Sequence, residues 1–186
     1  MRLTQPRIPP LPSSEWNSDV QELMATLKSE GQVFNIFRTL ERHPDLLRRW
    51  LVFANHVLGK STLPAREREL AILRTGWLCR AEYEWGHHVE IGGKAGLSAG
   101  EIKRVTRGAA DPGWQPGEAA VLQAADELHR DSFISDATWK ALAQHYNEQQ
   151  LIDLIFAVGQ YTLVCMTLNS LGVQLEEGYE RLPVER

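Results

Sequence analysis

A carboxylate and an imidazole lie one helical turn apart near the middle of the chain. Glu84 and His88 are four residues apart, a spacing at which side chains on one helix face can meet. A carboxylate in that position orients and charges the imidazole, which can then transfer protons near neutral pH. The preceding segment can deliver a second carboxylate from Glu69. These three residues predict a proton-transfer centre.

Each of these residues also has a plainer interpretation. Glu69 lies in the run RERE, and such runs usually form a solvated face; beside Leu70 it would lie at the boundary of the buried face. Glu84 and His88 would then be a helix-stabilising pair worth about 0.2–0.5 kcal/mol. His87 competes for the functional role. Neighbouring helical positions point about 100° apart, so His88 is the histidine that shares a face with Glu84.

Metal and thiol chemistry have weaker support. Glu84 and His87 match the E-x-x-H spacing of di-iron bundles, but those sites need a second copy and two more glutamates, and the sequence has no second copy. We therefore expect no metal. Cys79 and Cys165 lie far apart in the sequence and form neither a C-x-x-C pair nor a zinc pattern. Both are predicted to be small packing residues.

Two helices within residues 63–101 must position the candidate centre. The first begins near Pro64, a residue that suits a first helical turn. The second begins at residues 81–83 and ends at Gly96, which suits a C-terminal cap. Ser98 and Glu101 then form a capping box for a third helix.

Apolar residues at helical spacing cover most of the remaining chain, and no segment alternates as a strand would. The fold class is therefore all-α, a single-domain bundle of roughly eight helices. Residues 1–14 form a proline-rich arm, either disordered or lying across a neighbouring subunit, and residues 15–186 form the helical domain. The other predicted helices cover residues 19–29, 33–42, 44–58, 99–107, 116–129, 135–146 and 148–171.

The composition of the chain argues against some classes of binding partner. The 186 residues carry a net charge of −4, which argues against a nucleic-acid binder with a basic surface. No apolar run approaches the ~20 residues of a membrane span, and the N-terminal residues lack the apolar region of a secretory signal. With two cysteines and no disulfide framework, we expect a cytoplasmic protein that contacts neither nucleic acid nor membrane.

The segment RERELAILRTGWLCRAEYEWGHHVEIGGKAGLSAGEI resembles the carboxymuconolactone decarboxylase family, which also contains the alkylhydroperoxidase D proteins. The resemblance extends more loosely to NIFRTLERHPDLLRRW and to LIDLIFAVGQYTLVCMTLNSLGV. It implies an all-helical bundle of the alkylhydroperoxidase D-like type, with an active site between the two central helices. It also implies a homo-oligomer, whether dimer, trimer or hexamer.

In the peroxidase branch of that family, a glutamate on the first helix precedes C-x-x-C-x-x-x-H on the second. Matching the final histidine to His88 places the glutamate at Glu69 and the cysteines at Ala81 and Glu84. The resemblance thus carries over Glu69 and His88, whereas both redox cysteines are replaced. Cys79 lies two positions too early to substitute, so thiol-dependent peroxide chemistry is not expected.

The decarboxylase branch lacks the cysteine pair and uses no metal or organic cofactor, and the pattern Y-E-x-x-x-H is nearer to it. The resemblance implies a cofactor-independent lyase that acts on a small organic acid or lactone by proton transfer. His88 would be the general acid or base and Glu84 would orient it. Glu69 would be a second acid or base or would tune His88, and Tyr83 would donate a hydrogen bond to a developing enolate.

Two other functions remain open. An alkylhydroperoxidase-like antioxidant protein would need a reactive thiol at Cys79. A non-catalytic helical oligomer would bind a ligand in the same pocket, and it would be indicated if Glu69, Glu84 and His88 faced solvent with no cavity beside them.

Overall fold

The computed structural model describes residues 3–29 and 31–183, and over these ranges the chain is all-α, as predicted. One 3-10 turn and one small hairpin are the other regular elements of the described residues. In chain order the elements are η1 (Ser13–Glu15), α1 (Ser18–Thr26), β1 (Lys28–Ser29), β2 (Gln32–Val33), α2 (Asn35–Leu40), α3 (Pro44–Gly59), α4 (Ala65–Leu78), α5 (Glu82–Lys94), α6 (Ala99–Val105), α7 (Pro116–Asp131), α8 (Asp136–Leu142) and α9 (Glu148–Leu171).

Several helices begin where their capping residues require. Ser98 and Glu101 form the expected capping box of α6, and Asn147 caps α9. At α1 the side chain of Asn17 accepts the N–H of Val20. These side chains satisfy backbone donors that the first turn of a helix leaves without a partner.

The first predicted helix is too long. It ends at Thr26, and Lys28 then pairs with Val33 in an antiparallel hairpin. Gly31 lies at the turn with φ of +86°, a conformation that glycine adopts without steric cost. Strands of two residues are too short to show the alternation by which a strand is recognised in a sequence.

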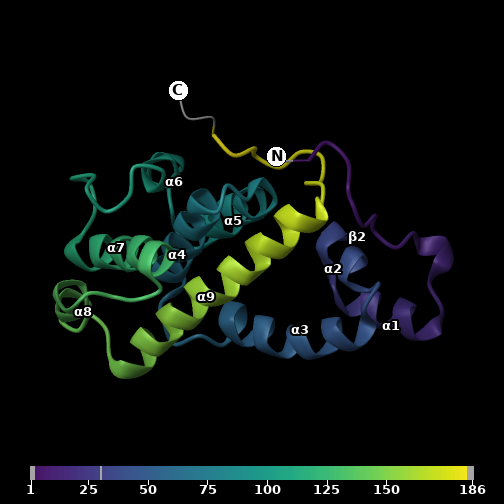
Figure 1. Cartoon of the computed structure of the whole chain (residues 1–186), viewed down its shortest axis with the longest axis horizontal. Coiled ribbons are helices and arrows are strands. Elements are labelled where there is room, and N and C mark those ends of the chain that lie inside the picture. The colour runs from purple at the N-terminus through teal and green to yellow at the C-terminus, as the bar shows by residue number, and fades with distance from the viewer. Residues whose placement is uncertain (1–2, 30, 184–186) are drawn as a thin grey trace.

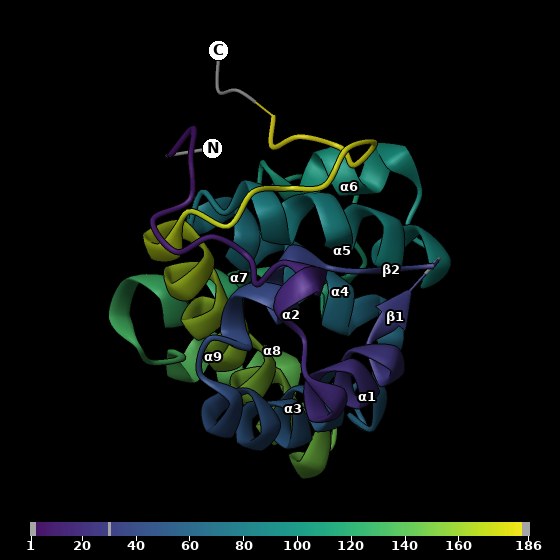
Figure 2. The same ribbon diagram turned by 90° about the vertical axis from the view of Figure 1, so that its right-hand side faces the viewer.

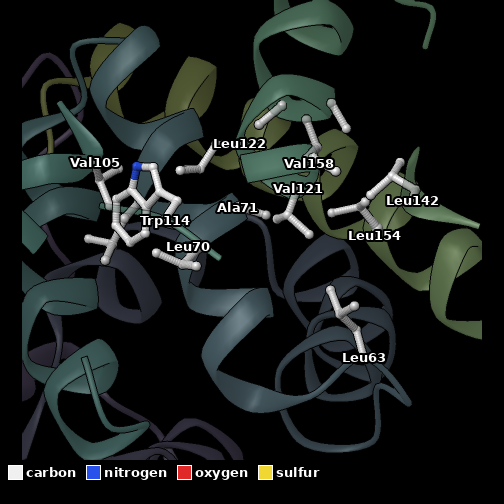
Figure 3. Packing of buried hydrophobic residues seen from close by; sticks show 14 of the residues in the cluster. Leu63, Leu70, Ala71, Val105, Trp114, Val121, Leu122, Leu142, Leu154 and Val158 are labelled. Atoms are coloured by element: carbon white, nitrogen blue, oxygen red, sulfur yellow. The ribbon is translucent and has the colours of Figure 1, made fainter. Parts of the chain in front are cut away.

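Helix α4 lies at the centre of the bundle, packed against α5, α6, α7 and α9. Figure 3 shows Leu70 and Ala71 of α4 among the core residues, together with Val121 and Leu122 of α7. Because neighbours surround α4, it buries several faces, and Glu69 lies inside the bundle with no exposed surface. The boundary position expected for Glu69 is therefore wrong.

Helix α9 crosses the molecule diagonally, from the α8 end to the C-terminal segment (Figure 1). By length and composition it is apolar enough to cross a membrane, which the sequence analysis did not expect, and half of its most apolar window is buried. A helix at the core of a globular protein passes the same test. Its remaining surface exposes Ile152, Phe156, Leu163 and Met166.

The N-terminal and C-terminal segments run over the same side of the molecule (Figure 2). The backbone N–H of Arg7 donates to the carbonyl of Leu171 at 2.8 Å, and Nε2 of Gln174 donates to the carbonyl of Leu3 at 3.2 Å. The described part of the arm is thus ordered on its own chain, which neither expectation for it anticipated. The domain boundary at residue 14 remains a prediction.

Candidate active site

Helices α4 and α5 bring three of the four predicted site residues together. Nδ1 of His88 lies 2.6 Å from Oε2 of Glu69, and its Nε2 lies 3.2 Å from Oε1 of Glu84. The exposed fraction is 0% for Glu69, 6% for Glu84 and 4% for His88. The imidazole is therefore held between two buried carboxylates, with both ring nitrogens occupied.

The carboxylates determine the charge of this imidazole. Burial lowers the pKa of His88, but the charge and hydrogen bond of Glu69, followed by those of Glu84, outweigh burial and raise the pKa to about 9. At neutral pH the ring is therefore an imidazolium that donates to both carboxylates. In this state His88 can act as a general acid, and it becomes a base only after it has given up a proton.

Glu69 has a second cationic partner. Nε of Arg68 lies 3.2 Å from Oε1 of Glu69, and the Arg68 side chain is 11% exposed. The ion pair of the plainer interpretation and the contact with His88 thus coexist on one carboxylate. The formal charges of Glu69, Glu84, His88 and Arg68 cancel, which reduces the cost of burying four ionised groups.

A cavity of about 330 Å³ lies beside His88, between α2, α3, α5 and α9. His88 and Glu84 reach its wall, whereas Glu69 lies behind them. Apolar and aromatic side chains form most of the surface, and Lys and Arg are absent from the described residues that line it. The cavity thus lies on the α3 and α9 side of α5, rather than between the two central helices. Its apolar lining includes Leu27, Phe34, Ile36, Phe37, Trp50, Leu51, Ala54, Leu58, Ile91 and Val164.

Tyr83, the fourth predicted residue, lines the cavity with its ring but uses its hydroxyl elsewhere. The hydroxyl donates to Oε1 of Glu176 at 3.0 Å and accepts the backbone N–H of Ile36 at 3.2 Å. Burial is the main reason that the pKa of Tyr83 lies well above its usual value. This hydroxyl therefore stays protonated and joins the C-terminal segment to the start of α2.

His87 belongs to this second network and not to the first. Its Nε2 lies 2.8 Å from Oε2 of Glu176, and its ring packs against Phe34, Tyr83 and Tyr179. Burial raises the pKa of Glu176, but hydrogen bonds from His87 and from the backbone of residue 35 outweigh burial and lower it. Consecutive histidines of α5 thus bind different carboxylates.

The C-terminal segment can cross α5 only because residue 86 has no side chain. A Cβ on Gly86 would lie 2.9 Å from the carbonyl oxygen of Glu180 and 2.9 Å from the methyl carbons of Leu175. This close approach brings Glu176 to His87. The role of residues 173–183 in the site was missed, because the sequence showed only a tail of mixed character.

Two residues of α9 were also missed. The ring of Tyr161 meets His88 edge-on, with centroids 4.8 Å apart, and lines the cavity. Gln160 lines the cavity too, is 4% exposed, and its buried Oε1 has no hydrogen-bond partner. A buried acceptor without a partner is costly, so Gln160 is the kind of group that a ligand completes. A glutamine in the middle of the most apolar helix was the available sequence signal.

The E-x-x-H pattern does not converge in space. Glu84 contacts His88, whereas His87 contacts Glu176. Within residues 3–29 and 31–183, no group of three or more His, Cys, Asp or Glu side chains is arranged to hold a metal ion.

The two cysteines are far apart in the sequence but adjacent in space. The Cys165 thiol, on α9, is in hydrogen-bonding contact with the Cys79 thiol, at the end of α4. The sequence predicts two separate packing residues, because spacing along the chain does not show which helices pack together.

Just under half of the chain matches a known protein family. Residues 44–127 match the carboxymuconolactone decarboxylase family. The family resemblance inferred from the sequence is confirmed, and the matched part contains Glu69, Glu84 and His88. No curated protein sequence matches the chain.

Solved structures share the fold over almost the whole chain. An uncharacterised peroxidase-related protein from Ralstonia eutropha JMP134, with an alkylhydroperoxidase core, is 20% identical at a TM-score of 0.79, covering 91% of this chain and 93% of that one. A peroxidase-related protein from Silicibacter sp. TM1040 is 16% identical at 0.79, covering 96% and 93%. The debrominase Bmp8, in complex with 2,3,4-tribromopyrrole, is 14% identical at 0.77, covering 94% of each chain. The TM-scores and coverages establish the alkylhydroperoxidase D-like fold.

Proposed function

We propose that the protein is a cofactor-independent enzyme of the carboxymuconolactone decarboxylase type that acts on a small organic substrate by acid–base proton transfer. One observation carries the proposal: an imidazolium, His88, lies between Glu69 and Glu84 at the wall of a largely apolar cavity. A buried, charged, hydrogen-bonded histidine beside a cavity is typical of catalytic sites.

The residues of the site would have different roles. His88 and Glu84 reach the cavity and would touch the substrate, so they are the proposed catalytic pair. Glu69 lies behind His88 and would act through it, as a positioning residue. Tyr83 would shape the wall with its ring, because its hydroxyl is already bonded to Glu176.

The cavity favours an uncharged lactone over an acid. A bound carboxylate would need a cationic partner in an apolar cavity. The described lining offers neither lysine nor arginine, and the His88 imidazolium is already balanced by Glu69 and Glu84. A lactone or a related neutral carbonyl compound needs only one or two donors. A volume of about 330 Å³ is at the small end of ligand sites. The tribromopyrrole bound by the related debrominase is likewise a small, mostly apolar ring.

For such a substrate His88 would give its Nε2 proton to the carbon or oxygen on which negative charge develops, and Glu69 would hold the resulting neutral imidazole through the remaining Nδ1–H. The buried Oε1 of Gln160 lacks a partner and would accept a hydrogen bond from a hydroxyl or N–H group of the substrate. Tyr161, edge-on to His88, would hold the ring orientation.

The test is a panel of lactones and keto acids, assayed by NMR in deuterated buffer for turnover and for hydrogen exchange beside the carbonyl. We expect activity with neutral members of the panel and its loss in His88→Gln. Full turnover in that variant would refute the acid–base role. Binding without turnover or exchange by the wild-type protein would instead indicate the non-catalytic ligand-binding function.

We also propose that the protein is a homo-oligomer, with the exposed apolar face of α9 as its contact surface. Phe156, Leu163 and Met166 are each more than half exposed on this face, and Val52 of α3 is 75% exposed. Apolar surface of this extent usually meets a partner. Light scattering tests this proposal: the wild type should be an oligomer and Met166→Lys should dissociate. A monomeric wild type that sediments with lipid vesicles would instead indicate that this face binds a membrane. The cytoplasmic location remains a prediction.

A further inference from the structure

Two thiols meet where the end of α4 packs against α9. Cys79 is the C-cap of α4, and Cys165 is fully buried in α9. The thiols are in hydrogen-bonding contact. One turn after Cys165, Nδ2 of Asn169 donates to the Cys79 carbonyl at 3.0 Å. The backbone at Cys79 is therefore fixed to the same stretch of α9 that carries Cys165.

The surroundings of the two thiols differ. Cys79 is partly exposed, and its Sγ lies 3.8 Å from Nδ1 of His129, an exposed residue of α7. An imidazole at this position can take up the thiol proton and so supply the thiolate, which is the reactive form. The contact with Cys79 and burial both raise the pKa of the Cys165 thiol. Cys79 is therefore the thiol that reacts first, and Cys165 the one that follows.

We propose that Cys79 and Cys165 are a redox-active pair that closes to an intramolecular disulfide by exchange with a low-molecular-weight disulfide, RSSR. The Cys79 thiolate attacks one sulfur of RSSR; a mixed disulfide forms and RS⁻ leaves, taking up a proton. The sulfur of Cys165 then loses its proton and attacks Sγ of Cys79, which breaks the bond to the remaining SR group and releases a second RSH. The protein loses two protons and two electrons, and RSSR is reduced to two RSH.

The pair is separate from the acid–base centre but adjoins it. Neither thiol occupies the positions that align with the family's C-x-x-C, which here are Ala81 and Glu84. The disulfide would tie α4, the helix of Glu69, to α9, the helix of Tyr161. Since the proposed proton transfer uses no thiol, this inference stands or falls independently of the proposed function.

The experiment uses the full chain, reduced and then equilibrated with oxidised glutathione as RSSR. We expect both thiols to be lost to alkylation, a peptide pair linked through Cys79 and Cys165 in a non-reducing digest, an upward shift in Tm, and reversal by dithiothreitol. In Cys165→Ala the reaction should stop at a glutathione adduct on Cys79. In His129→Ala the linked product should still form, but more slowly at neutral pH.

Two results would overturn the proposal. One is a stable glutathione adduct on Cys79 in the wild type, as expected for Cys165→Ala. It would show that the sulfur of Cys165 cannot reach Sγ of Cys79. The other is retention of both thiols by the folded protein under conditions that oxidise the unfolded chain. Cys79→Ser is the matched control. It should form no linked peptide, and its melting temperature should stay close to that of the reduced wild type, which shows that the variant is folded.

Discussion

Glu69 lies fully buried, with one carboxylate oxygen 2.6 Å from Nδ1 of His88. The two residues come from different helices, so their contact depends on the packing of α4 against α5. Because the carboxylate is ionised next to a buried ring, it holds a proton on His88 that burial alone would remove. The pKa of His88 therefore depends on the packing of α4 against α5.

Stability should fall when the medium becomes alkaline. The folded pKa of His88, about 9, lies above its ordinary value of 6.5. Its contribution is therefore fully present below pH 6.5 and is lost as the pH rises through about 9. We expect a loss on the order of 1–3 kcal/mol in unfolding free energy, measured by urea denaturation between these limits. His88→Gln should flatten this dependence; an unchanged slope would contradict the assignment.

Replacing the buried carboxylate should make His88 more acidic. Glu69→Gln keeps the shape but removes the charge that outweighs burial, so the pKa of His88 should fall. An NMR titration of the imidazole would show the shift without a substrate. The control is Glu90→Gln, on α5, where the side chain of Glu90 is 40% exposed. This variant should leave the pKa of His88 unchanged. Once a substrate is known, the pH above which activity is lost should fall together with the pKa of His88.

Gln160→Leu should separate binding from stability. The wild-type amide buries an oxygen without a partner, so an apolar residue of similar size should leave the unfolding free energy unchanged or raise it by about 1 kcal/mol. Ligand affinity should fall about tenfold or more, since one hydrogen bond is worth about 1 kcal/mol or somewhat more. A stability loss of several kcal/mol would mean that Gln160 has a structural partner.

Asn169→Ala supplies the matched control on the same helix. Its side chain bonds the Cys79 carbonyl away from the cavity lining. We expect this variant to lose about 1 kcal/mol of stability and to keep its affinity for ligand. Thermal denaturation and calorimetry on both variants would therefore give opposite patterns.

Tyr83→Phe should loosen the C-terminal segment. The change deletes a donor to Glu176 and an acceptor for the Ile36 N–H, and leaving buried polar groups unpaired costs about 1–3 kcal/mol. Hydrogen exchange in residues 173–183 should become faster. Gly86→Ala should do the same by contact, because its Cβ would meet Leu175 and Glu180. Unaltered exchange in both variants would show that the segment is held by other contacts.

Local spacing was enough to predict the all-α class, most of the helices and the Glu84–His88 pair, whereas the match of Glu69 to the site came from the family resemblance. The i, i+4 relation of Glu84 and His88 is fixed by one helix. It was not enough to predict which side of α5 faces a cavity, or that Glu69 is fully inside. Those features depend on the packing of several helices around α4.

The remaining misses share this cause. Gln160, Tyr161 and Glu176 lie about 70 to 90 positions from His88 in the chain, and nothing in local periodicity links them to it. Likewise, the contact of Cys79 with Cys165 appears only once α4 and α9 are placed side by side. The hairpin after α1 was missed for a different reason, since its strands have two residues each.

The electroneutral set of Glu69, Glu84, Arg68 and His88 has a consequence for turnover. Whenever the imidazolium hands its hydrogen ion to a substrate that ends the cycle uncharged, the interior is left with one uncompensated anion. His88 must then recover a hydrogen ion before the next turnover. Rearrangement of a neutral lactone returns that hydrogen ion from the substrate and consumes none from the medium, whereas conversion of an anionic substrate into a neutral product consumes one per turnover, a difference that a weakly buffered assay can count.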